Sequence, residues 1–159
     1  MTANAQVYER AIRGSSDYDA GIRRAMSAGK PARRIHEALM VDDIQRAADA
    51  LHPLFEASHR LDGFVSFELE PTLLHGAPAT VAEVRHLSHQ IDRYNVMVEI
   101  PATPVGLEAI RELVADGVSV NVTHLFSVAD YEKAAAAYLS GLEQYITSHS
   151  VWRLSLIHI

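Results

Sequence analysis

The chain has 159 residues, of which 48% are hydrophobic and 21% charged, so it can bury the core of one globular domain. A formal net charge of −6 without any run of Lys or Arg argues against a nucleic-acid partner. The chain has no cysteine, which excludes disulfides and thiol catalysis. No apolar run could span a bilayer and no signal-peptide pattern begins the sequence, so we expect a cytoplasmic protein without a membrane partner.

The first third of the chain has the periodicity of helices. Apolar residues recur at helical spacing over residues 15–26 and 31–39, which predicts two helices. Asp42 or Asp43 can cap a third helix, which would be kinked or shortened by Pro53 because proline lacks an amide hydrogen.

From Phe64 onward the pattern changes to strands separated by helices. Residues 64–70, 95–100 and 118–123 predict strands, because β-branched and other apolar residues alternate there with polar ones. Pro71 and Pro101 would end the first two strands, since proline cannot donate to a ladder.

The helices between these strands have recognisable starts. Thr80 and Glu83 have the spacing of a capping box, and Thr103 and Ser127 are good N-cap residues. Gly117 is typical of a helix C-terminus. Strand, helix and strand in succession predict parallel strands joined by right-handed crossovers, and therefore an α/β fold preceded by a helical segment.

Polar residues gather toward the carboxyl ends of the three predicted strands, at Ser66, Glu68, Glu99, Asn121 and Thr123. In a (β/α)8 barrel these positions converge on the interior mouth, where active sites lie. Glu68 could act as a general acid/base or position a water, or it could pair structurally with Lys or Arg. Asn121 and Thr123 could bind a hydroxylated substrate or a water, or they could satisfy backbone groups at the strand end.

The histidines give no clear metal motif. His86 and His89 have a spacing of three that could bind a metal, but no further ligand surrounds them, so a solvated helix face is favoured. His124 follows Thr123, so alternation would turn it away from the cavity unless the strand has already ended. Neither a Gly-rich phosphate loop nor a nucleophile elbow is present, and we predict neither metal nor cofactor.

Three segments together resemble the transaldolase family: Ser66–Pro71 (SFELEP), Val98–Leu107 (VEIPATPVGL) and Gly117–Ser127 (GVSVNVTHLFS). The segment Ala3–Ile12 also looks like the part of that family that follows strand two. The likeness runs from about Asn4 to about residue 145, with the motifs in the family's order and spacing.

The resemblance implies a partial (β/α)8 barrel of the class I aldolase type and a sugar-phosphate substrate. The family transfers a dihydroxyacetone unit from sedoheptulose 7-phosphate to glyceraldehyde 3-phosphate in the pentose phosphate pathway, through a Schiff base on a Lys in strand four. By motif match, the predicted catalytic positions are Glu68, which helps to place the catalytic water, Glu99 and Thr123. The predicted substrate-binding residues are Asn4, Ser66 and Asn121.

Two departures from the family bear on activity. Glu99 occupies the Schiff-base Lys position, and a carboxylate cannot form an imine. The sequence also resembles only the part of the family from the end of strand two through strand five and its helix. We therefore expect a fragment that is inactive as written. The alternatives are a non-catalytic barrel that binds a sugar phosphate, and metal chemistry with Glu68 and Glu99 as oxygen ligands.

The last residues differ in character from the rest. The sequence from Leu154 to Ile159 resembles the translation of a sequencing-library adapter, so we divide the chain into an incomplete barrel domain, residues 1–150, and a non-native tail, residues 151–159. The unpaired edges of an incomplete sheet would favour aggregation or a homo-oligomer.

Overall fold

The computed structural model describes residues 2–3, 5–69, 76–149 and 157–158. In chain order the elements are β1 (Thr2–Ala3), α1 (Ala5–Gly14), α2 (Asp19–Ser27), α3 (Ala32–Ala57), β2 (Val65–Glu68), α4 (Ala77–Ile91), β3 (Val96–Pro101), α5 (Pro104–Ala115), β4 (Val120–Thr123), α6 (Val128–Ser148) and β5 (Ile157–His158).

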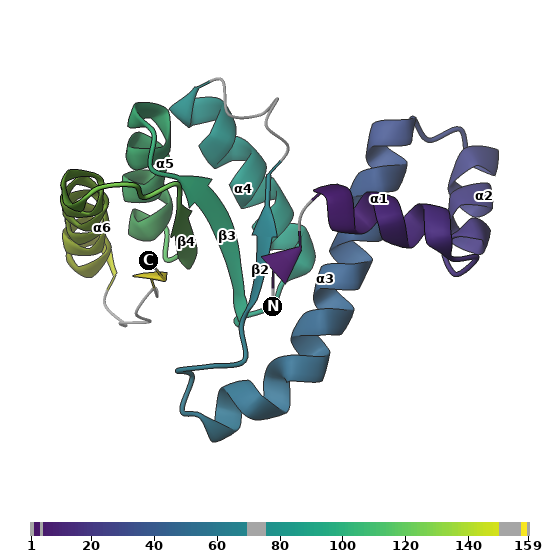
Figure 1. The fold of residues 1–159 in the computed structure, drawn as a ribbon, viewed down its shortest axis with the longest axis horizontal. Helices are drawn as coiled ribbons and strands as arrows, with labels where there is room; N and C mark the ends of the chain where they lie inside the picture. Colours follow the sequence, from purple (N-terminus) through teal and green to yellow (C-terminus); the bar gives the residue numbers. More distant parts are fainter. Residues whose placement is uncertain (1, 4, 70–75, 150–156, 159) are drawn as a thin grey trace.

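The strands form one parallel sheet in the order β1-β2-β3-β4-β5 (Figure 1). Spatial order therefore follows chain order without reversal, which is the winding of a (β/α)8 barrel and differs from that of a doubly wound sheet. The architecture is a partial barrel of parallel strands alternating with helices, preceded by a helical segment, and this confirms the predicted fold class.

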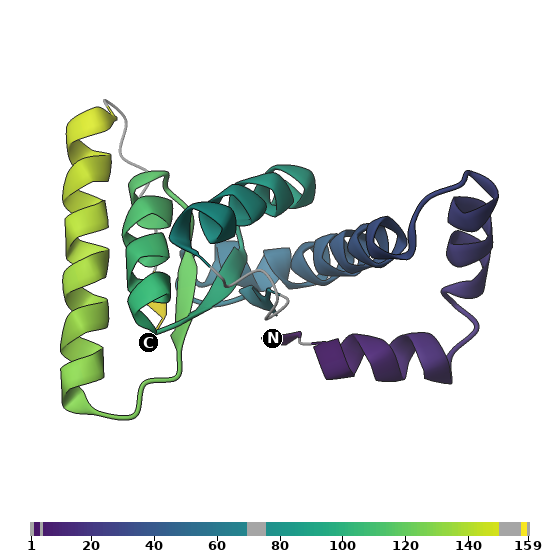
Figure 2. The ribbon, with the colours of Figure 1, turned by 90° about the horizontal axis from the view of Figure 1, so that it is seen from above.

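The hydrophobic core lies between the sheet and the helices α4 and α5. Phe67 of β2, Val98 of β3 and Val120 of β4 are at most 2% exposed and pack in one cluster with residues of these helices. Helix α6 packs on α5 in turn, farther from the sheet (Figure 2). The strands therefore direct alternate side chains into the core, and the opposite face of the sheet carries the polar positions.

The helical segment differs from the prediction in one respect. Residues 31–39 and the segment after Asp43 belong to a single helix, α3, because Val41 and Ile44 continue one buried stripe across the predicted break. The helix also runs through Pro53 to Ala57. Burial of Phe55, which is 4% exposed, offsets the local cost of the proline.

Two of the three predicted helix starts are confirmed. The Thr103 side chain accepts a hydrogen bond from the Gly106 amide and Ser127 accepts one from Asp130. The capping box at Thr80 is wrong: α4 begins at Ala77, and the buried Thr80 hydroxyl donates to the Gly76 carbonyl oxygen 3.0 Å away. Proline in the first turn of α4 fits a helix start there, one turn before Thr80.

The strand ends differ slightly from the predicted ones. Pro101 is the last residue of β3 and pairs with Thr123, and the ladder continues past it because the Ala102 amide donates to the Thr123 carbonyl oxygen at 2.9 Å. The strand predicted over residues 64–70 is observed as Val65–Glu68, while Glu70 and Pro71 lie outside the described residues.

Little of the predicted tail falls within the described residues. Ile157 and His158 form β5, which pairs with Val120 and Asn121 of β4. The other residues after 150 lie outside the described ranges, and the division of the chain at residue 150 stays a prediction. Across the described ranges, no helix combines the length and the apolar character that crossing a membrane would require.

Candidate functional site

Three predicted site residues form a hydrogen-bonded cluster on the sheet face that is turned away from α4 and α5, here called the inner face. The Ser66 hydroxyl donates to Glu99 Oε1 at 2.8 Å, and Asn121 Nδ2 donates to Ser66 Oγ at 3.1 Å. Asn121 Nδ2 also lies 3.5 Å from Glu99 Oε1, at the limit of a hydrogen bond. The three side chains come from β2, β3 and β4, so the cluster spans the centre of the sheet.

Strand register explains why these residues meet. Glu99 is directly paired with Glu68 on one side and with Asn121 on the other. The neighbours of Glu99 along β3, Val98 and Ile100, are buried in the core, and alternation therefore turns Glu99 to the inner face. The pattern of the sequence is sufficient for this placement.

Glu99 is a carboxylate in a protected position. It is 9% exposed, and its Oε1 accepts the hydrogen bond from Ser66, which is 6% exposed. In the described part of the chain, neither Glu99 nor Glu68 forms an ion pair with Lys or Arg. The structural alternative for Glu68, a pair with a cation, therefore finds no support among these residues. The hydroxyl of Ser66 offsets part of the cost of burying the Glu99 carboxylate.

Glu68 is paired with Glu99 in the register of the sheet, but it does not belong to the hydrogen-bonded cluster of Ser66, Glu99 and Asn121. It is exposed, and it lines a cavity of about 30 Å³ together with Arg33 and His36 of α3. The structure thus brings Glu68 next to Glu99 along the sheet without joining it to the cluster.

Thr123 lies at the carboxyl end of β4, with its hydroxyl 3.2 Å from His124 Nδ1. β4 ends at Thr123, so the exception to the alternation argument applies: the backbone leaves the strand at His124 with a φ of +60°. The His124 ring also meets Phe126 edge to face, with ring centroids 6.0 Å apart. His124 is therefore a neighbour of the candidate site that alternation alone would miss.

The remaining predicted residue, Asn4, lies outside the described residues, and its role in substrate binding stays a prediction.

His86 lies in an ion-pair cluster on α3 and α4 and does not form a purely solvated face. Its Nε2 is 2.8 Å from Glu37 Oε1, and Arg34 Nη1 lies within 2.9 Å of both Glu37 oxygens. Burial acts to raise the pKa of Glu37, but the hydrogen bonds from His86 and Arg34 outweigh it and hold that pKa below its ordinary value. Among the described residues, no three or more His, Asp or Glu side chains are grouped to hold a metal, so Glu68 and Glu99 gain no third ligand.

A family model and the curated relatives of this chain point to the same family. The family model described as Transaldolase/Fructose-6-phosphate aldolase matches residues 1–155. "Transaldolase 2" of Nostoc punctiforme is 45% identical over 144 residues, which cover 91% of this chain and 38% of the relative. "Transaldolase" of Acidothermus cellulolyticus is 39% identical over 158 residues, which cover 99% of this chain and 42% of the relative. The chain thus spans about two fifths of the length of the curated relatives that it matches.

Proposed function

This chain belongs to the transaldolase/fructose-6-phosphate aldolase family, and from that premise we propose that it is part of a barrel that binds a sugar phosphate at the inner face of its sheet. The parent reaction in this proposal is transfer of a dihydroxyacetone unit from sedoheptulose 7-phosphate to glyceraldehyde 3-phosphate. A cytoplasmic location and self-association through open sheet edges belong to the same proposal.

The observation that carries the proposal is the cluster of Ser66, Glu99 and Asn121. It presents a hydroxyl, a carboxylate and an amide from three neighbouring strands on one face. These groups can exchange hydrogen bonds with the hydroxyls of a sugar. Thr123 supplies a further hydroxyl at the end of β4.

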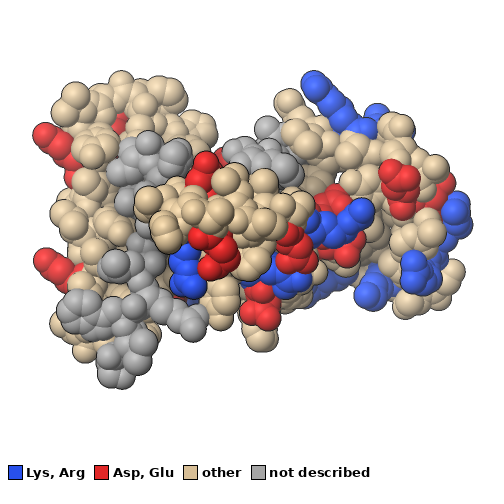
Figure 3. Space-filling model, turned by 90° about the horizontal axis from the view of Figure 1, so that it is seen from below, with Lys and Arg blue, Asp and Glu red and all other residues tan. Residues whose placement is uncertain are grey.

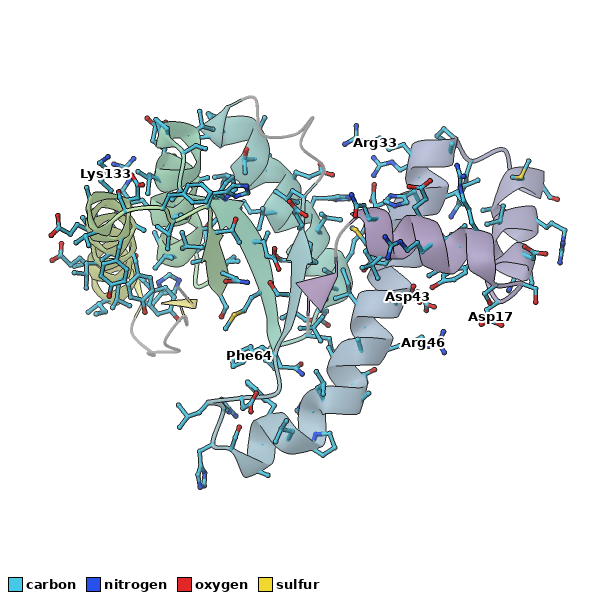
Figure 4. All side chains as sticks on the ribbon, viewed as in Figure 1. Asp17, Arg33, Asp43, Arg46, Phe64 and Lys133 are labelled. Atoms are coloured by element: carbon cyan, nitrogen blue, oxygen red, sulfur yellow. The ribbon has the colours of Figure 1, made fainter. Side chains whose placement is uncertain are left out.

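The proposal assigns the Schiff-base position to Glu99, and this removes the covalent step. An imine needs an amine, and the whole sequence contains only two lysines, Lys30 and Lys133. Lys30 is exposed between α2 and α3. Lys133 lies on α6, where it is 63% exposed and 3.6 Å from Asp130 (Figure 4). Neither lysine comes from a strand of the sheet, so neither supplies an amine at the position of Glu99.

A second candidate function follows from the same cluster. Ser66 and Asn121 retain their mutual hydrogen bond beside Glu99, so the polar surface for a sugar remains formed without the amine. A non-catalytic protein that binds sugar phosphates would need no more than this.

Borohydride trapping with fructose 6-phosphate, followed by intact-mass measurement, tests the proposal. In a longer protein that contains this segment, the Glu99 form should give no adduct and E99K should give one. In the 159-residue chain, E99K should give none, because the chain spans only about two fifths of its relatives. Binding of fructose 6-phosphate by the longer Glu99 form, without turnover, would favour the second candidate. An adduct on the Glu99 form would show that another lysine carries the chemistry and that the assignment of Glu99 is wrong.

A further inference from the structure

A cavity of about 700 Å³ lies among α1, α2 and α3. Its volume is within the range of small-molecule sites. Its described lining residues come from these helices, from the turn between α1 and α2, and from Val65 at the start of β2. The polar residues of the inner face are not among them. The cavity is therefore separate from the candidate active site.

The lining of this cavity includes two tyrosines and a carboxylate, which are Tyr8, Tyr18 and Asp43. Tyr18 donates its hydroxyl hydrogen to Asp43 Oδ2 at 2.7 Å. Tyr8 is 7% exposed, and its ring is held edge to face against His36 with the centroids 6.1 Å apart. Across the described residues, the Tyr8 hydroxyl has no hydrogen-bond partner. A tyrosine that is nine-tenths buried thus keeps an unused donor and acceptor beside Asp43.

The electrostatic surroundings of both tyrosines are negative. Burial, followed by the charge of Asp43, raises the pKa of Tyr8 to about 12. The hydrogen bond to Asp43, followed by burial, raises the pKa of Tyr18 to about 12, although Arg46 acts in the opposite direction. Both hydroxyls are therefore neutral near pH 7, and the charge of Asp43, which acts on both of them, favours a positive group nearby.

The lining of the cavity carries further charges, which are of both signs. Asp17 and Asp42 line it with Asp43, and the two cations in the lining are Arg24 and Arg46. Within the described ranges none of these five side chains forms an ion pair, and the carboxylates outnumber the guanidinium groups. Figure 4 shows Asp17, Asp43 and Arg46 along the lower side of the N-terminal helices. Figure 3 shows charged side chains of both signs gathered over this half of the molecule.

We propose that the cavity binds a small organic cation, namely a primary ammonium group on an apolar stem. The ammonium group is held between the Tyr8 hydroxyl and the Asp43 carboxylate, both of which belong to the lining. The stem lies against apolar residues of the lining, among them Val7, Ala11, Leu39, Ile44 and Val65. A divalent metal is a poorer fit, because the described residues contain no group of three or more metal-ligating side chains.

The ligand can be a simple amine or an amino acid, whose carboxylate would meet Arg24 or Arg46 at the rim. Binding of a series of ligands that share one stem to the 159-residue chain distinguishes a simple amine from an amino acid. Isothermal titration calorimetry should show that phenethylamine binds at least about tenfold more tightly than phenethyl alcohol, because only the amine pairs with a carboxylate. Phenylalanine binding more tightly than phenethylamine would assign the amino-acid source, and the reverse order would assign the simple amine. Hydrocinnamate, the anion of the same series, should bind at least about tenfold more weakly than the amine.

Variants then locate the site. D43N should weaken phenethylamine binding at least about tenfold while leaving the alcohol unchanged, since the amide keeps the shape but loses the charge. Y8F should weaken amine binding about threefold through loss of one hydroxyl. The control D19N removes a carboxylate of α2 that pairs with Arg23 and does not line the cavity, and it should change nothing. Far-ultraviolet circular dichroism verifies that each variant is folded.

Three results would overturn the proposal. One is that phenethylamine fails to bind, or binds no better than phenethyl alcohol, a result that does not depend on any variant folding. Another is that a folded D43N keeps its affinity for the amine. The third is that D19N loses as much affinity as D43N, which would mean that the amine responds to the overall charge of the chain.

Discussion

The N-terminal helical segment, residues 5–57, and the alternating segment, residues 65–148, are held together in different ways. Helix α2 buries none of its residues, whereas α5 buries five, among them Ile110, Leu113 and Val114, each at 0% exposed. The difference arises because α5 packs against the sheet on one side and α6 on the other, while α2 contacts mainly α3.

This contrast indicates where sequence changes are tolerated. In the alternating segment, the helices pack so closely that some positions have no room for a side chain. A Cβ added at Gly141 of α6 would collide with the Arg111 carbonyl oxygen of α5. In the helical segment, a cavity of about 700 Å³ lies among α1, α2 and α3, and its walls carry polar groups. The first arrangement fixes the sheet, and the second leaves space for a ligand.

Matched glycine substitutions should give the largest effect. A Cβ at Gly106 of α5 would meet the Pro101 carbonyl oxygen, which cannot move without disturbing β3. Gly14 of α1 has open space around it. We expect G106A to lower the free energy of unfolding by about 3 kcal/mol. G14A should raise it by about 0.5 to 1 kcal/mol through helix propensity. Urea unfolding followed by circular dichroism measures both; equal effects would contradict the contrast between the segments.

The junction of the two segments should be the next most sensitive place. Asn95 is 2% exposed, and its Nδ2 donates to the Ala48 carbonyl oxygen at 2.8 Å and to that of Gly63 at 3.0 Å. N95A would remove both hydrogen bonds from a buried site and should cost about 2 kcal/mol in urea unfolding. As a control, Q45A removes the Gln45 hydrogen bonds to Gln90 and Ile91 at a less buried site and should cost about 1 kcal/mol or less. A larger loss of unfolding free energy in Q45A than in N95A would show that Asn95 is not the main link between the two segments.

A smaller effect should depend on pH. The pKa of Glu37 is held below its ordinary value of 4.5 although burial alone would raise it, because His86 and Arg34 donate to the carboxylate. The stability from this lowered pKa is fully present above pH 4.5 and is lost as the pH falls through the folded-state value. Compared with wild type, E37Q should therefore lose less stability between pH 5 and acidic conditions. Urea unfolding over this pH series checks it, and parallel curves would contradict the assignment.

The smallest effect should come from the tail. Deletion of Leu154 to Ile159 should leave thermal stability unchanged or improve solubility, since the described contact of this tail with the sheet is the two-residue pairing of β5 with β4. A thermal melt followed by circular dichroism measures this. A clear fall in the melting temperature would show that the tail belongs to the fold.

The sequence by itself determined what depends on neighbouring residues. Alternation in β3 was sufficient to turn Glu99 away from the core, and the caps at Thr103 and Ser127 follow from side chains that bond to amides three residues on. The family motifs then gave the order of strands and helices. These features depend on residues that are close together in the sequence, so the sequence pattern predicts them directly.

Tertiary structure decided what depends on packing between distant segments. It joined two predicted helices into α3, because Val41 and Ile44 belong to one buried stripe. It also brought Tyr18 of the turn after α1 to Asp43 of α3, across 25 residues. No local pattern marks such a pair, because its distance depends on how whole helices and strands pack, which the free energy of burial determines for the chain as a whole.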